Sequence, residues 1–147
     1  KFSEESLTML LIFVVDNGLK VHHVLETHIH ADHITGASRL REKLRAKLVV
    51  GSRLPEIQET FVDLLGLDGS EINAGIFDVL MTDNDILHSG SLTIRAIHTP
   101  GHTPACTTYQ IEDAIFTGDT LFMPDFGTGR CDFPNGSAET LYHSIKM

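Results

Sequence analysis

The segment from Thr27 to His33 reads Thr-His-Ile-His-Ala-Asp-His, and it constrains the fold and chemistry of this chain more than any other. It places three histidines and one aspartate within six residues, and these side chains are the usual ligands of zinc and non-haem iron. Residues 21–25, just upstream, have the composition of a buried strand, which predicts a ligand-bearing loop at a strand end. Packing alone explains the cluster poorly, because several polar side chains would need burial and hydrogen-bond partners together. The segment therefore predicts a metal or catalytic site.

Length and composition limit the class of protein. The chain has 147 residues, 41% hydrophobic and 21% charged, as in a soluble domain or part of one. It contains no apolar run long enough for a membrane span, and its acidic N-terminus does not predict a signal peptide. A net charge of −9 argues against nucleic-acid binding, which needs clustered Lys and Arg. Cys106 and Cys131 form no disulfide framework, so we expect a cytoplasmic protein.

Periodicity predicts a layered α/β domain over residues 1–147. In the first half, helices are expected after a cap at Ser3 or Ser6 up to Asp16, and at 35–46 and 55–65, with strands at 21–26 and 47–50. In the second half, an antiparallel meander is expected from segments 77–81, 91–98, 105–111 and 114–117, followed by a helix at 137–145.

Two further loops at predicted strand ends carry metal-competent side chains. Residues 97–104 hold His98 and His102 in a turn stiffened by proline and glycine, which lowers the entropy cost of holding a ligand. Thr117-Gly118-Asp119 places a carboxylate directly after a strand, and the glycine permits close backbone approach. Taken alone, Asp119 could equally cap a turn. Together with the other two motifs, a ligand role is favoured.

Three motifs in this order resemble the metallo-β-lactamase superfamily, namely His-x-His-x-Asp-His at 28–33, Thr-Pro-Gly-His-Thr at 99–103 and Thr-Gly-Asp at 117–119. The longer runs at 26–36 and 129–133 resemble its persulfide dioxygenase branch, which is related to glyoxalase II. Residues 121–127 are similar to bacterial members named β-lactamase-hydrolase-like. The resemblance implies an αββα sandwich with the metal site at one edge of the sheets.

For the dioxygenase branch, the resemblance implies one Fe(II) held by His28, His102 and Asp119. Two histidines and one carboxylate form the facial set that leaves open positions for O₂ and substrate. The expected substrate is a low-molecular-weight persulfide, glutathione persulfide first, which is oxidised to sulfite and the free thiol.

The rest of the first motif has different implied roles in the two branches. In the dioxygenase branch His30, Asp32 and His33 surround the iron without binding it and orient ligands or water. In hydrolytic relatives that cleave thioesters or lactams, one zinc is implied on His28, His30 and His102 and a second on Asp32 and His33, with Asp119 as the bridge. His30 is thus a candidate metal ligand, and Asp32 and His33 are candidate catalytic residues. Ligand type does not determine the metal, and the motifs near the C-terminus favour iron.

Arg130 is the candidate substrate-binding residue, because its planar guanidinium suits a carboxylate of glutathione. An internal ion pair with Asp125 or Asp132 is the alternative. Asp132 and His98 are expected to support the metal site without binding the metal. Tyr109 alternates with apolar neighbours on a predicted strand and is expected in the core.

The resemblance also predicts an incomplete sandwich. Strands that precede the first helix in the family, and a later segment that supplies a last metal-site histidine, have no counterpart here. Unpaired sheet edges invite pairing with another chain, so we expect a homodimer. The expected partner is otherwise a small thiol or persulfide, with no nucleic acid and no membrane. A truncated, catalytically silent domain is the alternative to both enzyme activities.

Overall fold

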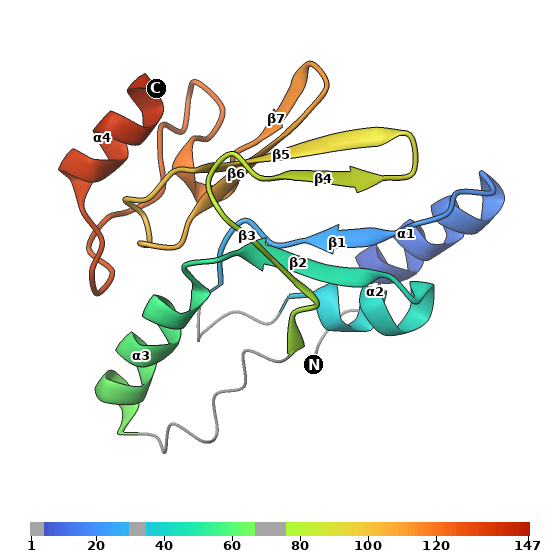
Figure 1. Ribbon diagram of the computed structural model, residues 1–147, viewed down its shortest axis with the longest axis horizontal. Coiled ribbons are helices and arrows are strands. Elements are labelled where there is room, and N and C mark those ends of the chain that lie inside the picture. The colour runs from blue at the N-terminus through green and yellow to red at the C-terminus, as the bar shows by residue number, and fades with distance from the viewer. Residues whose placement is uncertain (1–4, 30–34, 67–75) are drawn as a thin grey trace.

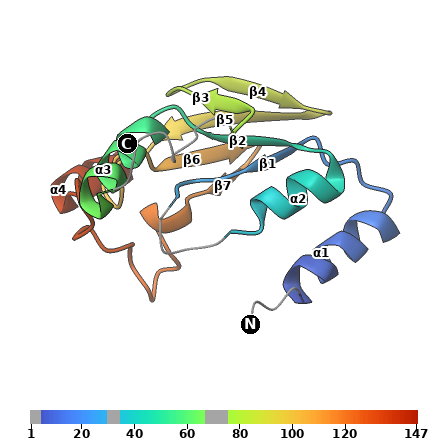
Figure 2. The same ribbon diagram turned by 90° about the horizontal axis from the view of Figure 1, so that it is seen from below.

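The computed structural model describes residues 5–29, 35–66 and 76–147 and contains two sheets with helices around them (Figure 1). In chain order the elements are α1 (Glu5–Asp16), β1 (His23–Leu25), α2 (Ala37–Leu44), β2 (Lys47–Gly51), α3 (Leu54–Leu65), β3 (Val79–Met81), β4 (Ile86–Ser89), β5 (Leu92–His98), β6 (Thr107–Ile111), β7 (Ala114–Phe116), the 3₁₀ turn η3 (Gly118–Thr120) and α4 (Ala138–Lys146). Figure 2 shows α1 and α2 at one end of the molecule and α3 and α4 at the other. Within the described ranges, no helix is long and apolar enough to cross a membrane.

The first sheet has the order β1-β2-β3 and is parallel. Its central strand β2 is buried at every residue but the first, as expected for a strand with neighbours on both sides. Val49 of β2 pairs with Leu25 of β1 and with Val79 of β3. Pro55 lies in the first turn of α3, and Gly66 ends that helix in the left-handed conformation with φ +60°. The helices and strands predicted in the first half are therefore confirmed, although β1 is shorter than the predicted strand.

The predicted meander is wrong in two elements. Segment 77–81 forms β3, which lies in the parallel sheet beside β2 and not in the antiparallel sheet. Asp78 fixes this position: its backbone N–H donates to Leu48 O at 2.9 Å, and its carboxylate accepts the Leu48 N–H at 2.8 Å. The antiparallel sheet has the order β4-β5-β6-β7, and β4 falls between two predicted strands. β4 has only four residues and joins β5 through a turn at Gly90 with φ +64°, so its pattern is too short to be recognised from sequence.

The hydrophobic core lies between the two sheets. One buried cluster joins residues of the parallel sheet to residues of the antiparallel sheet: Val49, Met81, Ile94, Ala96 and Tyr109. Tyr109 is 2% exposed, which confirms its predicted place in the core, and its hydroxyl donates to Glu26 O at 3.0 Å. Because Glu26 directly follows β1, this hydrogen bond ties the two sheets together beside the first histidine motif. The paired sheets with helices around them confirm the predicted α/β fold.

Candidate metal centre

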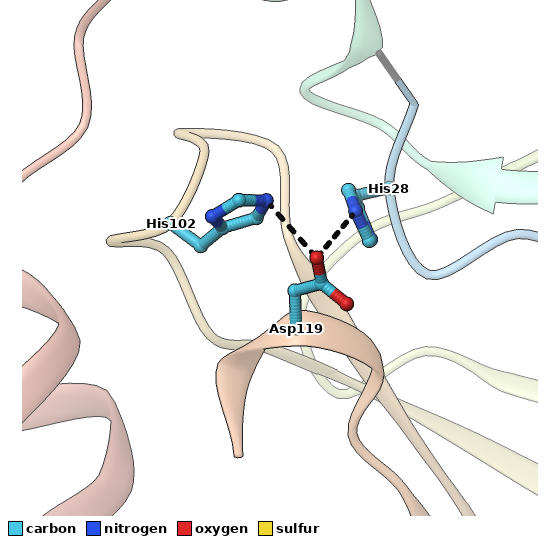
Figure 3. A group of neighbouring side chains, drawn as sticks. All are labelled: His28, His102 and Asp119. Carbon is cyan, nitrogen blue, oxygen red and sulfur yellow. Dashed lines mark ion pairs between the residues drawn. The ribbon is translucent and has the colours of Figure 1, made fainter. Parts of the chain in front are cut away.

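His28 lies in the loop that follows β1. The preceding residue is held by strand β6, because the Thr107 N–H donates to Thr27 O at 2.9 Å. Gly118 packs against the same threonine so closely that an added Cβ would lie 2.3 Å from Thr27 Oγ1, and its φ of +53° also favours glycine. Thr27 Oγ1 lies 3.1 Å from His28 Nδ1. These contacts orient the ring so that His28 Nε2 faces Asp119 (Figure 3).

His102 is the buried member of the site, with 2% of its surface exposed. It lies in the loop after β5, where Gly101 packs on α4: an added Cβ would lie 2.4 Å from the Leu141 Cα. Gly101 O also accepts the Ser137 N–H at 2.8 Å. The ring Nδ1 donates to Arg130 O at 2.5 Å, since a carbonyl oxygen only accepts. A neutral ring therefore carries its lone pair on Nε2, which is the tautomer that a metal ligand needs.

Asp119 lies in η3, directly after β7. Its Oδ2 is 3.4 Å from His102 Nε2 and 3.6 Å from His28 Nε2 (Figure 3). The turn is set by Gly129, whose N–H donates to Asp119 O at 2.9 Å. A Cβ at Gly129 would lie 2.4 Å from that oxygen, so no larger residue fits without displacing the turn. The side chains of His28 and Asp119 are 14% and 39% exposed, so the carboxylate is partly accessible to solvent.

The three ligand atoms fit a divalent metal ion. They all lie within 4.8 Å of one another. Two atoms bound to one metal at about 2.1 Å, at octahedral or tetrahedral angles, are about 3.0 to 3.5 Å apart, and the separations to the carboxylate oxygen are 3.4 and 3.6 Å. The Arg130 carbonyl occupies Nδ1 of His102, so Nε2 is the ring nitrogen that faces the Asp119 oxygen and the centre of the triangle, where a metal ion could bind both atoms.

The other candidate residues of the histidine motif lie outside the described residues, so their roles stay predictions: His30, Asp32 and His33. His98 is described, and its hydrogen bonds are with the last residue of β3 and with Asp83, two residues further on. Its N–H donates to Asp83 Oδ1 at 2.8 Å, and its Nε2 lies 3.3 Å from Met81 O. These bonds anchor the end of β5, from which the loop of His102 starts.

Arg130 contacts the site through its backbone. Its carbonyl oxygen accepts from His102, whereas its guanidinium Nε lies 3.7 Å from Asp132 Oδ1. The structure therefore contains the ion pair within the chain that was the alternative role for Arg130. The Arg130 and Asp132 side chains of this pair are 63% and 75% exposed. Asp132 contacts this arginine, and its support of the metal site stays a prediction.

Three groups that shape the centre have no role in the sequence prediction, although two of their residues lie in its motifs: Thr27, Gly129 and the Arg130 carbonyl. A backbone carbonyl leaves no signal in a sequence. Gly129 does leave one, because a glycine beside a candidate site residue indicates close backbone approach. Thr27 could have been found as the neighbour of His28 with a side chain able to reach Nδ1.

Burial raises the pKa of two groups around the ligands. Burial raises the pKa of the Glu26 carboxyl, and a hydrogen bond with Thr35 opposes this effect. Burial likewise raises the pKa of the Cys106 thiol, whose Sγ accepts the Thr103 N–H at 3.4 Å beneath the loop of His102. Low-dielectric surroundings therefore extend close to the candidate metal ligands, where electrostatic interactions are strong.

Comparison with known proteins agrees with this geometry. A family model described as the metallo-beta-lactamase superfamily matches residues 3–147. Glyoxylase B2 of Dictyostelium discoideum is 47% identical over 152 residues, which cover 98% of this chain and 50% of that protein. Human mitochondrial persulfide dioxygenase ETHE1 is 37% identical over 130 residues, which cover 87% of this chain and 43% of that protein. The crystal structure of ETHE1 from Myxococcus xanthus matches with a TM-score of 0.76 at 33% identity, covering 97% of this chain and 54% of the other.

The chain spans about half the length of the curated relatives it matches. Their names divide between a glyoxylase and a persulfide dioxygenase, so the family is common to them while the activity differs. The matched model extends over almost the whole chain, and the two-sheet fold with its cluster of two histidines and one aspartate agrees with it. This chain belongs to the metallo-beta-lactamase superfamily.

Proposed function

We propose that this chain binds one Fe(II) ion and oxidises a low-molecular-weight persulfide, glutathione persulfide first, to sulfite and the free thiol. The observation that carries the proposal is the meeting of His28, His102 and Asp119 within 4.8 Å. Two histidines and one carboxylate are the set that non-haem Fe(II) oxygenases use, because it leaves coordination positions open. The similarity to persulfide dioxygenase ETHE1 supports the same chemistry.

When bound, Fe(II) supplies the redox chemistry that joins O₂ to a sulfur atom. Persulfide, O₂ and water together give thiol, sulfite and protons, so the outer sulfur is oxidised and O₂ is reduced. The residues of the chain position the ligands. The Arg130 carbonyl keeps the proton of His102 on Nδ1, Thr27 orients His28, and the Asp119 carboxylate offsets part of the metal charge beside a buried histidine.

Arg130 is the proposed anchor for a carboxylate of glutathione. Its ion pair with Asp132 is long, at 3.7 Å, and both side chains are mostly exposed. Such exposed pairs contribute little to stability, so the guanidinium can exchange Asp132 for a substrate carboxylate at small cost. A planar guanidinium binds a carboxylate through two parallel hydrogen bonds, which suits this role.

A zinc-dependent hydrolase of glutathione thioesters is the second candidate. The 47% identity with Glyoxylase B2, against 37% with human ETHE1, favours it. In that case His28, His102 and Asp119 take part in zinc binding, and His30, Asp32 and His33 complete the site. Both candidates use the same centre, so metal identity and substrate distinguish them.

The test is metal content by mass spectrometry on protein purified without added metal, with assays on the same preparation. His28→Ala removes a ligand, and His88→Ala is the matched control because His88 is exposed on β4. About one iron per chain that is lost only in His28→Ala, with O₂ uptake on glutathione persulfide, supports the proposal. Bound zinc with thioester cleavage and no O₂ uptake overturns it in favour of the hydrolase. An absence of bound metal and of both activities overturns both candidates and leaves the catalytically silent domain.

A further inference from the structure

Three threonine hydroxyls form a buried network beside the metal centre. Thr99, Thr108 and Thr120 are 5%, 4% and 3% exposed. Thr99 Oγ1 lies 3.0 Å from Thr108 Oγ1 and 3.0 Å from Thr120 Oγ1, and the Thr120 hydroxyl lies 3.4 Å from Thr99 O, to which it donates. Buried hydroxyls need hydrogen-bond partners, and these three provide partners for one another.

One arrangement of protons satisfies the whole network. Thr120 donates to Thr99 O, Thr99 donates to Thr120 Oγ1, and Thr108 donates to Thr99 Oγ1. Loss of any of these hydroxyls leaves a buried polar group without its partner, which is costly in a low-dielectric interior. The network therefore favours one relative position of the three chain segments that carry it.

Two of these segments also carry metal ligands. Thr99 begins the loop that contains His102, and Thr120 directly follows Asp119 in η3. Thr108 is the second residue of β6 and contacts Thr99 directly, which in turn contacts Thr120. The network thus acts on the separation of Asp119 Oδ2 from His102 Nε2, which is 3.4 Å.

We propose that Thr120, through its hydrogen bonds with Thr99, is a positioning residue that holds the Asp119 carboxylate at metal-binding distance from His102. The inference rests on the proposed metal centre and adds a residue that does not itself bind the metal. Without the hydroxyl, η3 keeps its packing but loses the bonds that fix its position relative to the loop of His102. The carboxylate then moves relative to the imidazole, and metal affinity falls.

The experiment compares three variants in Co(II) binding. Thr120→Val keeps the side-chain shape without the hydroxyl, and Thr120→Ser keeps the hydroxyl. Ile57→Val is the matched control, because Ile57 is 0% exposed and lies in α3, outside the network and the segments that carry the candidate ligands. The dissociation constant for Co(II) is measured by competition with a chelator, and the visible absorption spectrum of the bound Co(II) reports the ligand geometry.

In Thr120→Val we expect Co(II) affinity to fall about 10- to 100-fold with a changed spectrum, as for other residues that orient metal ligands. Thr120→Ser and Ile57→Val are expected to keep the wild-type affinity and spectrum. Wild-type binding and spectrum in Thr120→Val overturn the inference. An equal loss in Ile57→Val also overturns it, because the effect is then a general consequence of a perturbed core.

A metal-free measurement separates this inference from the proposed function. If the wild-type chain binds no Co(II), the proposed function fails, and the inference is decided by crystal structures of the metal-free wild type and Thr120→Val. A longer separation between Asp119 Oδ2 and His102 Nε2 in the variant supports the positioning role. An unchanged separation overturns it.

Discussion

Gly129 and Arg130 place two of the candidate metal ligands through their backbone atoms. The Gly129 N–H donates to Asp119 O at 2.9 Å, and the Arg130 carbonyl accepts from His102 Nδ1 at 2.5 Å. A Cβ added at Gly129 would lie 2.4 Å from Asp119 O and 3.1 Å from His102 Nδ1. The backbone at these two residues therefore fixes a carboxylate and an imidazole together, and even one methyl group at Gly129 disturbs both.

Substitution of Gly129 by alanine is expected to weaken metal binding and to destabilise the fold. The added methyl group must push the Asp119 turn away, and such overpacking costs about 1–3 kcal/mol, while a displaced ligand lowers metal affinity by about tenfold or more. Urea unfolding and Co(II) titration measure the two effects. Gly36→Ala is the control, because the described atoms leave a Cβ at Gly36 free of contacts within 4 Å. Unchanged Co(II) affinity in Gly129→Ala would contradict the expectation.

At the scale of single residues, the sequence indicates the candidate metal ligands but not the groups that hold them in place. His28, His102 and Asp119 are recognisable as candidate ligands because the three motifs that carry them occur together in the chain. The support from the Arg130 carbonyl comes from a group that every residue carries, so no side chain marks it. The residue type of Arg130 suggests a role for its guanidinium group, and in the structure this group forms an ion pair with Asp132.

At the scale of the elements, strand β3 depends on one exposed carboxylate. Asp78 accepts the Leu48 N–H at 2.8 Å and an Arg41 guanidinium N–H at 2.7 Å. The backbone hydrogen bond from Leu48, followed by the side-chain bond from Arg41, lowers the pKa of Asp78 below its usual value. The ionised carboxylate thus links β3, β2 and α2.

Asp78 is expected to make the free energy of unfolding depend on pH. A carboxyl whose pKa is lowered in the folded state stabilises that state above the unfolded pKa of about 3.9, and the contribution is lost as the pH falls through the folded pKa. The free energy of unfolding in urea should therefore fall less between pH 7 and the acidic range in Asp78→Asn than in the wild type. Asp125→Asn, in an exposed loop, is the control. Equal pH dependence in Asp78→Asn and the wild type would show that this carboxylate has no such role.

The helices and strands that are predicted well from the sequence are those whose formation is marked by residues within or next to them. α3 is marked by an early proline and a terminal glycine, and β2 by a run of buried apolar residues. β3 is different, because its position depends on β2, which is far away along the chain, whereas β4 pairs with the neighbouring β5 and is only too short to be recognised. A three-residue strand such as β3 has no periodicity that distinguishes parallel pairing with β2 from antiparallel pairing with β5. The contact between Asp78 and Leu48, which decides the matter, is visible only in three dimensions.

At the scale of the whole molecule, the antiparallel sheet ends at β7 within the described residues. Ile115 and Phe116 on this strand are 59% and 52% exposed. Apolar side chains on an edge strand with open backbone groups favour pairing with another chain. The predicted homodimer is consistent with this edge.

We expect the chain to sediment as a dimer at micromolar concentration, with β7 of one copy beside β7 of the other. Ile115→Lys places a charge on this edge and should give a monomer, since edge lysines oppose strand pairing. Ile86→Lys on β4, at the opposite edge of the sheet and 52% exposed, is the control and should stay dimeric. A wild-type monomer in sedimentation, or loss of the dimer in Ile86→Lys alone, would argue against pairing through β7.

The metal centre draws its ligands from both layers of the fold. His28 follows a strand of the parallel sheet, whereas His102 and Asp119 follow strands of the antiparallel sheet. An ion bound there is a crosslink between the two layers, and it opposes sliding of one sheet over the other. A metal ion at this place would join the two sheets at the edge where the candidate ligands converge, so its binding would have a structural consequence besides any chemical one.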